Sequence, residues 1–277
     1  MTYGALPQLD PDDCIAVDIL RKRGIRVAAA VWDDTSVDWS ESRLCVLRST
    51  WDYPAHYAAF MSWLERVSVV TRIENAPALV RWNSDKRYLR DLEKAGVPTV
   101  PTEYVLPGET TPLDEICVRR GFHDIVVKPS RGAGTVGVKR FNAASRRAAQ
   151  AHLDCLLHSG GALIQPFLSS VETYPERALV FIDGAYSHAV TKTPFQALLP
   201  AGQAGEAPVV ATIEEIDVGH SAIDAVAGRL LYGRVDVVRD DAGTLRVLEL
   251  ELIEPSLFFS MHPPAAEAFA DAIVRRL

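Results

Sequence analysis

The stretch "RVLELELIEPSLF" (Arg246–Phe258) joins an alternating pattern to an apolar run. In an extended strand its three alternating leucines would lie on one face, with Glu249 and Glu251 on the other. The two carboxylates would then be roughly 7 Å apart, because neighbouring side chains on one face are two residues apart. A strand with one apolar face and two acids on the other predicts a cation-binding site, or a hairpin whose acidic face meets solvent.

The residues before this strand predict an antiparallel hairpin, with "RVDVV" and "LELE" as its arms and "DDAG" as its turn. Arg234 and Asp236 share one face of the first arm, so the hairpin would place them beside the two glutamates. Acids that are desolvated together without a counter-ion repel each other by several kcal/mol. A divalent cation relieves that repulsion, and oxygen-only ligands favour Mg²⁺ or Mn²⁺. The pattern therefore predicts Asp236, Glu249 and Glu251 as metal ligands, with Glu254 as a further acid.

Composition indicates an ordinary soluble globular protein, with 48% hydrophobic and 23% charged residues. A length of 277 residues predicts two or three subdomains. The formal charge of -7 argues against a general nucleic-acid binder, which would present a basic face. The four cysteines lie far apart without a CxxC pair, so neither a zinc site nor a disulfide framework is predicted. Without an apolar run of about 20 residues or a secretory start, we expect a cytoplasmic protein with no membrane partner.

The first 82 residues alternate helical and strand-like segments, which predicts a parallel sheet. A helix is expected over 12–22, ending at Gly24, and strand-like segments are expected over 25–32 and 43–48. Only "MTYGAL" precedes the first helix, so the first strand of this sheet should be short or absent.

The rest of the chain continues this mixture, which predicts an α/β fold with α+β character in its C-terminal part. "WNSDKRYLRDLEKAGVP" (Trp82–Pro98) predicts a helix with Asn83 or Ser84 as its cap and Gly96 near its end. Further strands are expected over 102–106, 124–128, 162–167 and 177–184, and further helices over 113–120, 143–158, 222–231 and 265–277.

A glycine-rich stretch, "SRGAGTVGVKRF" (Ser130–Phe141), contains the Gly-x-Gly-x-x-Gly spacing of a dinucleotide-binding fingerprint. That fingerprint opens a helix, whereas "VGVKRF" is strand-like, and no strand-borne acid follows about 20 residues later. A protein-kinase loop is excluded because no HRD or DFG follows, and a Walker A loop because no Gly-Lys-Ser/Thr triplet occurs. A glycine hairpin whose amides cover phosphates remains, supported by Lys128 and Arg131, with a plain surface turn as the alternative.

Two lysines and one strand end are further candidates for nucleotide binding. Lys128 ends an apolar strand just before a proline, where a lysine can project from the sheet edge toward a ligand. Lys86 is expected in the first turn of its helix, where most lysines are simply solvated. Backbone groups between Gln165 and Leu168 could bond an adenine edge, and Glu172 could bind ribose hydroxyls. An ordinary strand end with an exposed Glu explains the same letters.

These features occur in one order from about Asn83 to the C-terminus, and that ordered set resembles the ATP-grasp superfamily. The resemblance implies an ATP-grasp fold with a substrate domain over 1–82, a lid subdomain over 83–163 and a nucleotide and metal subdomain over 164–277. It implies ATP and two Mg²⁺ ions, with Mn²⁺ as the alternative metal, although Glu251 stands where Asn is usual. The nucleotide contacts that it implies are Lys86, Lys128, Ser130, Gly132, Gly134, Thr135, Gln165, Phe167, Leu168 and Glu172. It also implies that Arg234 steadies the transferring phosphoryl group, with Lys128 and Lys192 beside it.

The stretches "VLRSTWDY" (46–53), "RWNSDKRYL" (81–89) and "YSHAVTKTP" (186–194) are similar to one branch of the superfamily. That branch contains glutathione synthetase, ribosomal-modification enzymes and a cyclo-ligase of antibiotic biosynthesis. The implied reaction is ATP-dependent activation of a carboxylate as an acyl phosphate, which nitrogen then attacks. In the cyclo-ligase, O-ureido-D-serine closes to D-cycloserine, and ADP and phosphate are released. The implied substrate contacts are Arg48, Ser49, Thr50, Asp52 and His188.

Two other functions remain open from the sequence. An intermolecular carboxylate–amine ligase would need the same ATP apparatus and would differ in the size of its pocket. A nucleotide-binding module without turnover would have less need for three metal-binding acids. For the ligases we expect a small amino-acid-like substrate, no nucleic-acid partner and self-association as a homodimer.

Overall fold

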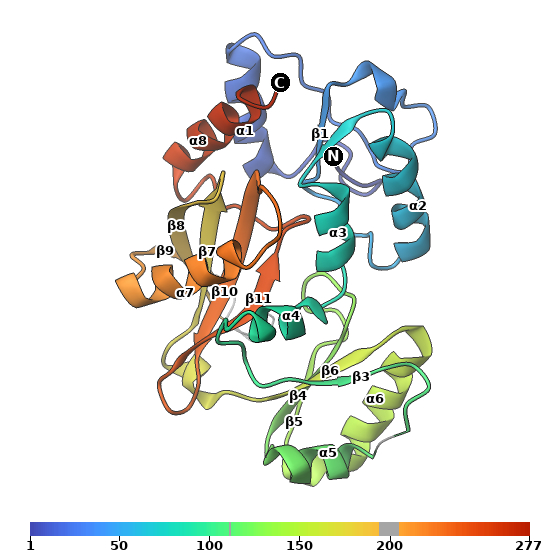
Figure 1. The fold of residues 1–277 in the computed structure, drawn as a ribbon, viewed down its shortest axis with the longest axis vertical. Coiled ribbons are helices and arrows are strands. Elements are labelled where there is room, and N and C mark those ends of the chain that lie inside the picture. Colours follow the sequence, from blue (N-terminus) through green and yellow to red (C-terminus); the bar gives the residue numbers. More distant parts are fainter. Residues whose placement is uncertain (111, 194–204) are drawn as a thin grey trace.

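The computed structural model describes residues 1–110, 112–193 and 205–277, so Pro194 at the end of the stretch 186–194 lies outside the described residues. Figure 1 shows an N-terminal unit at the top, a long sheet in the middle and a smaller sheet at the bottom. The described residues form sheets of two, five and four strands. No helix in these ranges is long and apolar enough to cross a membrane.

The N-terminal unit contains the predicted parallel sheet. Its elements are α1 (Pro11–Lys22), the 3-10 helix η1 (Trp39–Glu41), β1 (Leu44–Val46), α2 (Tyr57–Ser68), β2 (Arg72–Glu74) and α3 (Pro77–Asn83). β1 and β2 pair in parallel. Aromatic side chains fill the space between the sheet and α2, where Phe60 and Trp63 are fully buried.

The predicted strand over 25–32 is wrong, and the short first strand explains why. Thr2 makes one isolated parallel bridge to Val31. Its N–H donates to Ala30 O at 3.0 Å, and Trp32 N–H donates to Thr2 O at 3.0 Å. The segment is extended, but so short a neighbour cannot build a ladder along it. The expectation of a short first strand is confirmed.

The smaller sheet follows the predicted order of strands and helices closely. Its elements are β3 (Glu103–Val105), α5 (Leu113–Arg120), β4 (Ile125–Pro129), β5 (Lys139–Phe141), the 3-10 helix η2 (Ala143–Ser145), α6 (Arg146–Ser159) and β6 (Ala162–Pro166), with strand order β3-β6-β4-β5. α5 ends where Gly121 adopts a left-handed φ of 66°. The glycine-rich stretch connects β4 to β5. This sheet continues to Pro166, and the division of the chain at 82 and 163 stays a prediction.

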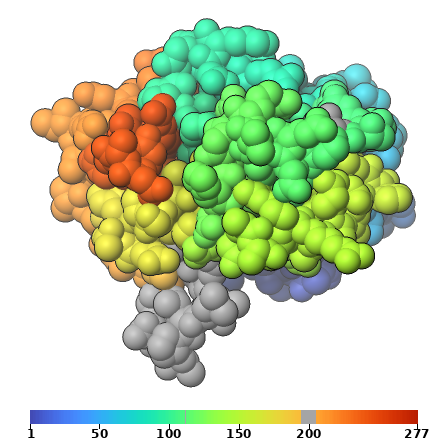
Figure 2. Space-filling view, turned by 90° about the horizontal axis from the view of Figure 1, so that it is seen from below, coloured from blue at the N-terminus to red at the C-terminus, as the bar shows by residue number. Residues whose placement is uncertain are grey.

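The long sheet is antiparallel and contains the predicted hairpin. Its elements are the 3-10 helix η3 (Ser169–Glu172), β7 (Glu176–Ile182), β8 (Ala185–Lys192), β9 (Glu206–Val209), α7 (Ile213–Asp224), β10 (Tyr232–Arg239), β11 (Leu245–Glu251) and α8 (Pro263–Val274). The strand order is β11-β10-β7-β8-β9. α1 and α8 lie side by side over one face, as Figure 1 shows. Figure 2, seen from below, shows the smaller-sheet unit (green to yellow-green) near the turn of the β10–β11 hairpin (orange-red).

Two predicted helices are wrong in their bounds. The helix expected between a cap at Asn83 or Ser84 and Gly96 begins later, because Asn83 is the last residue of α3 and α4 (Tyr88–Lys94) begins five residues after it. Lys86 lies in the link between them, where its N–H donates to Ser130 O at 2.7 Å instead of to a helical carbonyl. The helix expected over 222–231 is α7, which begins at 213 and ends at 224. Gly228, with a φ of 147°, follows in a loop.

One face of the long sheet changes character along its strands. At one end Val180 and Tyr232 are buried in an apolar cluster with α8. Two residues further along β10, the same face carries Arg234, which pairs in register with Glu251 of β11. The polar end of this face is where the predicted metal and phosphate residues meet.

Candidate active site

Asp236 is the centre of a network of ion pairs at the polar end of the long sheet. It is 1% exposed, and it accepts hydrogen bonds from Arg234 Nε at 2.8 Å and Arg234 Nη2 at 2.9 Å. Lys192 Nζ lies 2.9 Å from Asp236 Oδ2 and 2.5 Å from Glu176 Oε1. Arg234 also pairs with Glu251. The buried guanidinium therefore joins the two strands of the hairpin.

Lys86 joins the acids of β11 to the glycine-rich loop. Its Nζ lies 2.6 Å from Glu249 Oε1 and donates to Gly132 O at 2.9 Å. Its N–H donates to Ser130 O, as described above. Although burial disfavours its charge, Glu249 raises the pKa of Lys86, so the ammonium stays charged. A charged group at this junction can bind an anion that lies between the loop and the strand.

Lys128 is a buried cation without an ion pair in the described part of the chain. It is 5% exposed at the end of β4, and burial lowers the pKa of its ammonium, while the charge of Glu249 acts in the opposite direction. An isolated buried ammonium is costly unless an anion compensates it. Lys86, Lys128, Lys192 and Arg234 together give this region four positive groups, which suits a polyphosphate.

The acids are balanced by these cations, which corrects the expectation that they need a dication to tolerate each other. Burial disfavours ionisation of Asp236, but Arg234 and Lys192 hold the pKa of this carboxyl below its usual range. Burial raises the pKa of Glu176 to about 7. Burial, followed by the charge of Glu251, raises the pKa of Glu254 to about 8.

The predicted metal ligands share one face but do not surround a common point. Within residues 1–110, 112–193 and 205–277, no group of three or more His, Cys, Asp or Glu residues is arranged to hold a metal ion. The donor set nonetheless suits Mg²⁺, which prefers carboxylate oxygens. Glu249 and Glu251 each use Oε1 in their ion pairs, which leaves Oε2 for a ligand.

The glycine-rich loop lies over this cluster and is tied to the N-terminal unit. Gly134 and Gly137 have φ values of 61° and 76°, in the left-handed region. Arg131 Nε donates to Asp85 Oδ2 at 3.1 Å, and its guanidinium lies 4.2 Å from the ring centroid of Tyr57. Thr135 is exposed at the loop, whereas Ser130 at its base is buried. Through Arg131 the loop therefore contacts the N-terminal unit and the residues just after it, and its backbone can contact a nucleotide.

The predicted adenine and ribose residues lie at the end of β6 and in the segment that follows it, as far as η3. Gln165 is buried and donates to Thr102 Oγ1 at 2.8 Å, and Phe167 N–H donates to Asp124 O at 2.8 Å. Leu168 is 9% exposed. The Glu172 side chain is 68% exposed, with Oε1 3.8 Å from Arg140 Nη1. The Phe167 N–H is thus already bonded, while Glu172 remains accessible to a hydroxyl.

The predicted substrate residues of the N-terminal unit are partly engaged in the protein itself. Arg48 Nε and Ser49 Oγ donate to Asp13 at 2.8 Å and 2.7 Å, and Arg48 Nη2 donates to Pro255 O at 2.6 Å. Asp52 accepts from Trp32 Nε1 at 2.9 Å. These contacts fix the segment against the loop that follows β11.

Three buried polar atoms of these predicted substrate residues lack a hydrogen-bond partner among the described residues. They are Arg48 Nη1, Thr50 Oγ1 and His188 Nε2. Burial and the neighbouring His262 lower the pKa of His188 to about 4, so its imidazole is neutral at pH 7. A buried polar atom without a partner is unfavourable by about 1–3 kcal/mol. A polar ligand placed against these atoms would supply the missing hydrogen bonds.

Sequence reasoning missed Glu176 and Asn83 as parts of this region. Glu176 begins β7 opposite Lys192, and only the pairing of two strands that are separated in sequence reveals it. Asn83 was expected as a helix cap, yet its side chain bonds to Leu250 and Leu252. Neither role has a local sequence signal.

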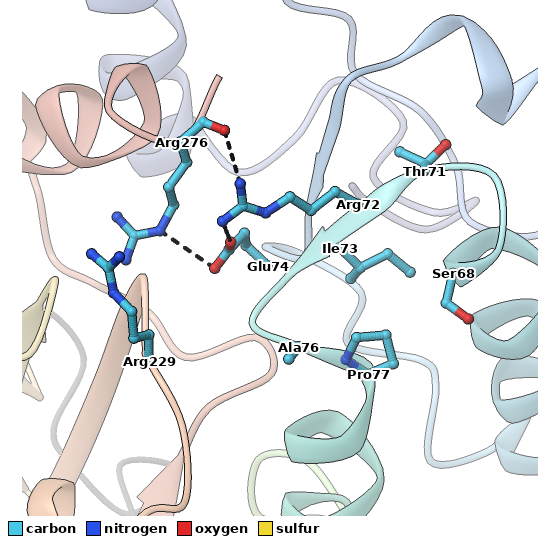
Figure 3. Close-up of a pocket in the computed structure, with 9 residues that line it drawn as sticks. All are labelled: Ser68, Thr71, Arg72, Ile73, Glu74, Ala76, Pro77, Arg229 and Arg276. Atoms are coloured by element: carbon cyan, nitrogen blue, oxygen red, sulfur yellow. Dashed lines mark hydrogen bonds and ion pairs between the residues drawn. The ribbon is translucent and has the colours of Figure 1, made fainter.

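A separate cavity of about 390 Å³ lies away from the predicted site residues. Figure 3 shows Arg72, Glu74 and Arg276 lining it, with Arg72 bonded to the carbonyl of Arg276 and to Glu74. Arg276 Nη2 also donates to Asp183 Oδ1 at 2.6 Å. These polar groups bond to one another, so the cavity lies where the N-terminal unit contacts the C-terminal residues of the chain. None of the predicted nucleotide residues lines it.

The chain has relatives whose activity is known. Residues 1–75 match the family described as "D-cycloserine synthetase DcsG, N-terminal domain". The cycloserine biosynthesis protein DcsG of Streptomyces lavendulae is 36% identical over 288 residues, which cover 97% of this chain and 95% of the relative. The chain belongs to the DcsG family of ATP-grasp ligases. A crystal structure of D-cycloserine synthetase DcsG matches with a TM-score of 0.91 at 34% identity, over 99% of this chain and 97% of the other.

The wider ATP-grasp fold is confirmed by a more distant structure. The D-alanine–D-alanine ligase of Bacillus anthracis complexed with ATP has a TM-score of 0.69 at 15% identity, over 99% of this chain and 94% of the other. Membership of the DcsG family makes the chain an ATP-dependent ligase. Its ligase relatives act on small amino-acid-like substrates, and solved neighbours of the same fold are complexed with ATP, or with Mg and ADP. The predicted family, fold class and enzyme class are confirmed.

Proposed function

We propose that this DcsG-family ligase activates the carboxylate of O-ureido-D-serine with ATP and closes it to D-cycloserine. The observation that carries the proposal is the 36% identity to a cycloserine biosynthesis protein over 97% of the chain. The unpaired buried Lys128 beside Lys86 and Glu249 supports it, because an ATP phosphate would compensate that ammonium.

The reaction follows from the charges of the site. A carboxylate oxygen of the substrate attacks the γ-phosphorus, the bond to the β-phosphate oxygen breaks, and ADP leaves. Arg234, Lys86, Lys128 and Lys192 neutralise the phosphoryl oxygens, since phosphoryl transfer depends on positioning and charge stabilisation. The oxyamine nitrogen attacks the acyl carbon and phosphate leaves. The carbamoyl part of the ureido group is hydrolysed by one water and leaves as carbon dioxide and ammonia, while the nitrogen bonded to oxygen stays in the ring and takes up a proton.

Mg²⁺ held by Asp236, Glu249 and Glu251 would neutralise nucleotide phosphates and orient them. Two ions are proposed, with Mn²⁺ as a substitute. Gln165, Phe167 and Leu168 are proposed to frame the adenine, and Glu172 to bind the ribose. Ser130, Gly132, Gly134 and Thr135 are proposed to cover the phosphates.

The substrate is proposed to lie between the N-terminal unit and the long sheet. Arg48, Ser49, Thr50 and Asp52 would face it from one side, and His188 from the other. Arg48, Thr50 and His188 have the unpartnered buried atoms described above, which supports their assignment. We further propose that the enzyme acts in the cytoplasm as a homodimer.

An intermolecular carboxylate–amine ligase is the second candidate. It is favoured by 31% identity over 192 residues to the D-alanine–D-alanine ligase of Methylacidiphilum infernorum, which cover 63% of this chain and 57% of the relative. A module without turnover is less consistent with a ligase family.

A mass-spectrometric screen of D-serine derivatives with ATP and Mg²⁺ tests the proposal. With O-ureido-D-serine we expect ADP and a product smaller than the substrate by the elements of HNCO and one water. A condensed two-component product would replace ring closure by the second candidate. No carboxylate-dependent ADP with any candidate would favour the module without turnover.

A further inference from the structure

β11 carries Glu249 and Glu251 at the edge of the long sheet, and among the described residues its outer side meets no strand beyond an isolated bridge between Thr99 and Val247. Its inner side pairs with β10. A strand edge with free N–H and C=O groups is mobile and open to other partners unless something pairs with it. The outer backbone groups of this edge are those of Val247, Leu250 and Leu252, as their partners below indicate.

Side chains take the place of the missing strand. Asn83 Nδ2 donates to Leu250 O at 2.8 Å, and Asn83 Oδ1 accepts from Leu252 N–H at 2.8 Å. One side-chain amide thus makes the donor and acceptor pair that a peptide group of a neighbouring strand would make. Asn83 is 7% exposed, so water cannot readily replace these bonds.

Neighbouring groups complete the edge. Tyr88 Oη accepts from Leu250 N–H at 2.9 Å, and Asn75 Nδ2 donates to Leu252 O at 2.8 Å. Further back, Val247 N–H donates to Pro98 O at 2.7 Å. Each of these contacts comes from the segment between β2 and β3. Asn83 differs from the others because it bonds both neighbours of Glu251 in the sequence, Leu250 and Leu252.

Asn83 is also three residues before Lys86, which pairs with Glu249 and contacts the glycine-rich loop. The segment from Asn83 to Lys86 therefore binds β11 at two points. Asn83 bonds its backbone, and Lys86 pairs with the carboxylate of Glu249. Two attachments on one short segment fix the distance between the lysine and the acids. A loss of the first attachment would leave the carboxylates free to shift relative to Lys86.

We infer that Asn83 is a positioning residue that sets the carboxylates of Glu249 and Glu251 for metal-bound nucleotide. It does so by completing the β11 backbone ladder in place of a strand. This inference rests on the proposed metal role of the two glutamates. It assigns no contact between Asn83 and the nucleotide.

The test compares Asn83→Ala and Asn83→Asp with the control Arg276→Met. Asp keeps the acceptor for Leu252 N–H but loses the donor to Leu250 O. Arg276→Met removes the three hydrogen bonds of a buried guanidinium, to Ala272, Asp183 and Leu230, none of which lies on β11, and should destabilise the fold at least as much. The readouts are the thermal midpoint, the Mg²⁺ concentration for half-maximal ADP formation, and Mn²⁺ affinity by calorimetry with a non-hydrolysable ATP analogue.

We expect both Asn83 variants to weaken Mg²⁺ activation and Mn²⁺ binding by about 10-fold or more, the size typical of groups that orient metal ligands. Arg276→Met should change neither by more than about twofold while lowering the thermal midpoint. Equal shifts in all three variants, or no shift in the Asn83 variants, would overturn the inference. The ligase reaction is tested separately with the wild-type enzyme. An active wild type, together with Asn83 variants whose Mg²⁺ activation and Mn²⁺ affinity are unchanged, would refute this inference alone.

Discussion

Lys86 Nζ lies 2.6 Å from Glu249 Oε1, so one ion pair connects the link between α3 and α4 to the acidic strand. The same ammonium donates to Gly132 O of the glycine-rich loop. The positions of the loop and of the acid are therefore coupled through a single side chain.

Replacing Glu249 by Gln should lower ADP formation at least about 100-fold, the size seen when one preorganised charge partner is lost. The amide keeps the volume of the side chain and an oxygen for Lys86, so circular dichroism should be unchanged. A coupled assay of ADP release measures the effect. Glu267→Gln, at a surface pair with Arg23, is the control and should retain full activity. Normal turnover of Glu249→Gln would remove this acid from the mechanism.

Arg234→Met should destabilise the fold by about 3–5 kcal/mol, because it leaves the buried Asp236 with Lys192 as its remaining cation. Arg23→Met removes a surface guanidinium with two acidic partners and should lower the free energy of unfolding far less than Arg234→Met does, because solvent screens surface pairs. Urea unfolding of both variants gives the comparison. Equal losses would mean that the buried network contributes no more than a surface pair.

Lys128→Met should separate stability from nucleotide binding. The free energy of unfolding should stay the same or rise, because an apolar side chain of similar volume avoids burying an unpaired charge. ATP affinity should fall about 10-fold or more, since one phosphate partner is lost. Calorimetric titration with ATP and urea unfolding measure the two quantities, with the exposed Lys139→Met as control. A destabilised variant with full ATP affinity would contradict the assignment.

Glu254→Gln should change how stability depends on pH. Burial raises the pKa of Glu254 to about 8 in the folded protein, above its ordinary value of 4.5. Between these values the folded state binds more protons than the unfolded state, so this group makes the free energy of unfolding fall as pH rises. The variant should show a shallower decline between about pH 5 and pH 8 in urea unfolding. An unchanged slope would mean that Glu254 titrates normally.

Gly137→Ala should weaken ATP binding more than Gly134→Ala. Both positions have left-handed φ values, so each alanine is strained by about 1–2 kcal/mol. At Gly137 the added Cβ would also meet Pro129 Cδ at 3.3 Å and Leu156 at 3.5 Å, whereas at Gly134 nothing lies within 4 Å. Fluorescence titration with a labelled nucleotide provides the dissociation constants. A larger loss in Gly134→Ala would show that local crowding does not govern the loop.

Local signals predicted the elements that end in a specific residue type. α5 begins and ends as expected because Gly121 stops it, and the β10–β11 hairpin turns at "DDAG" as expected. The start of α7 has a local signal that helical spacing did not reveal. Thr212 is the N-cap and Glu215 the third residue of the helix, and together they form a capping box at the usual spacing.

Other features depended on contacts that are distant in sequence. The helix expected after a cap at Asn83 or Ser84 begins only at Tyr88, because Lys86 N–H bonds to Ser130 O, which follows β4. The same-face arrangement of Asp236, Glu249 and Glu251 followed from strand alternation. Their pairing with cations from β8 and from the α3–α4 link did not, because only tertiary structure brings those segments together.

The long sheet has one face that is apolar beneath α8 and ionic a few residues further along the same strands. The candidate active-site side chains and the core side chains therefore lie on the same strands. Neither set can lose its structure without the other. Heat inactivation of this enzyme should coincide with cooperative loss of the whole sheet, and no inactive state with an intact core should accumulate on the way. Improving packing beneath α8 would then lengthen the working life of the catalyst without altering a residue that touches ATP.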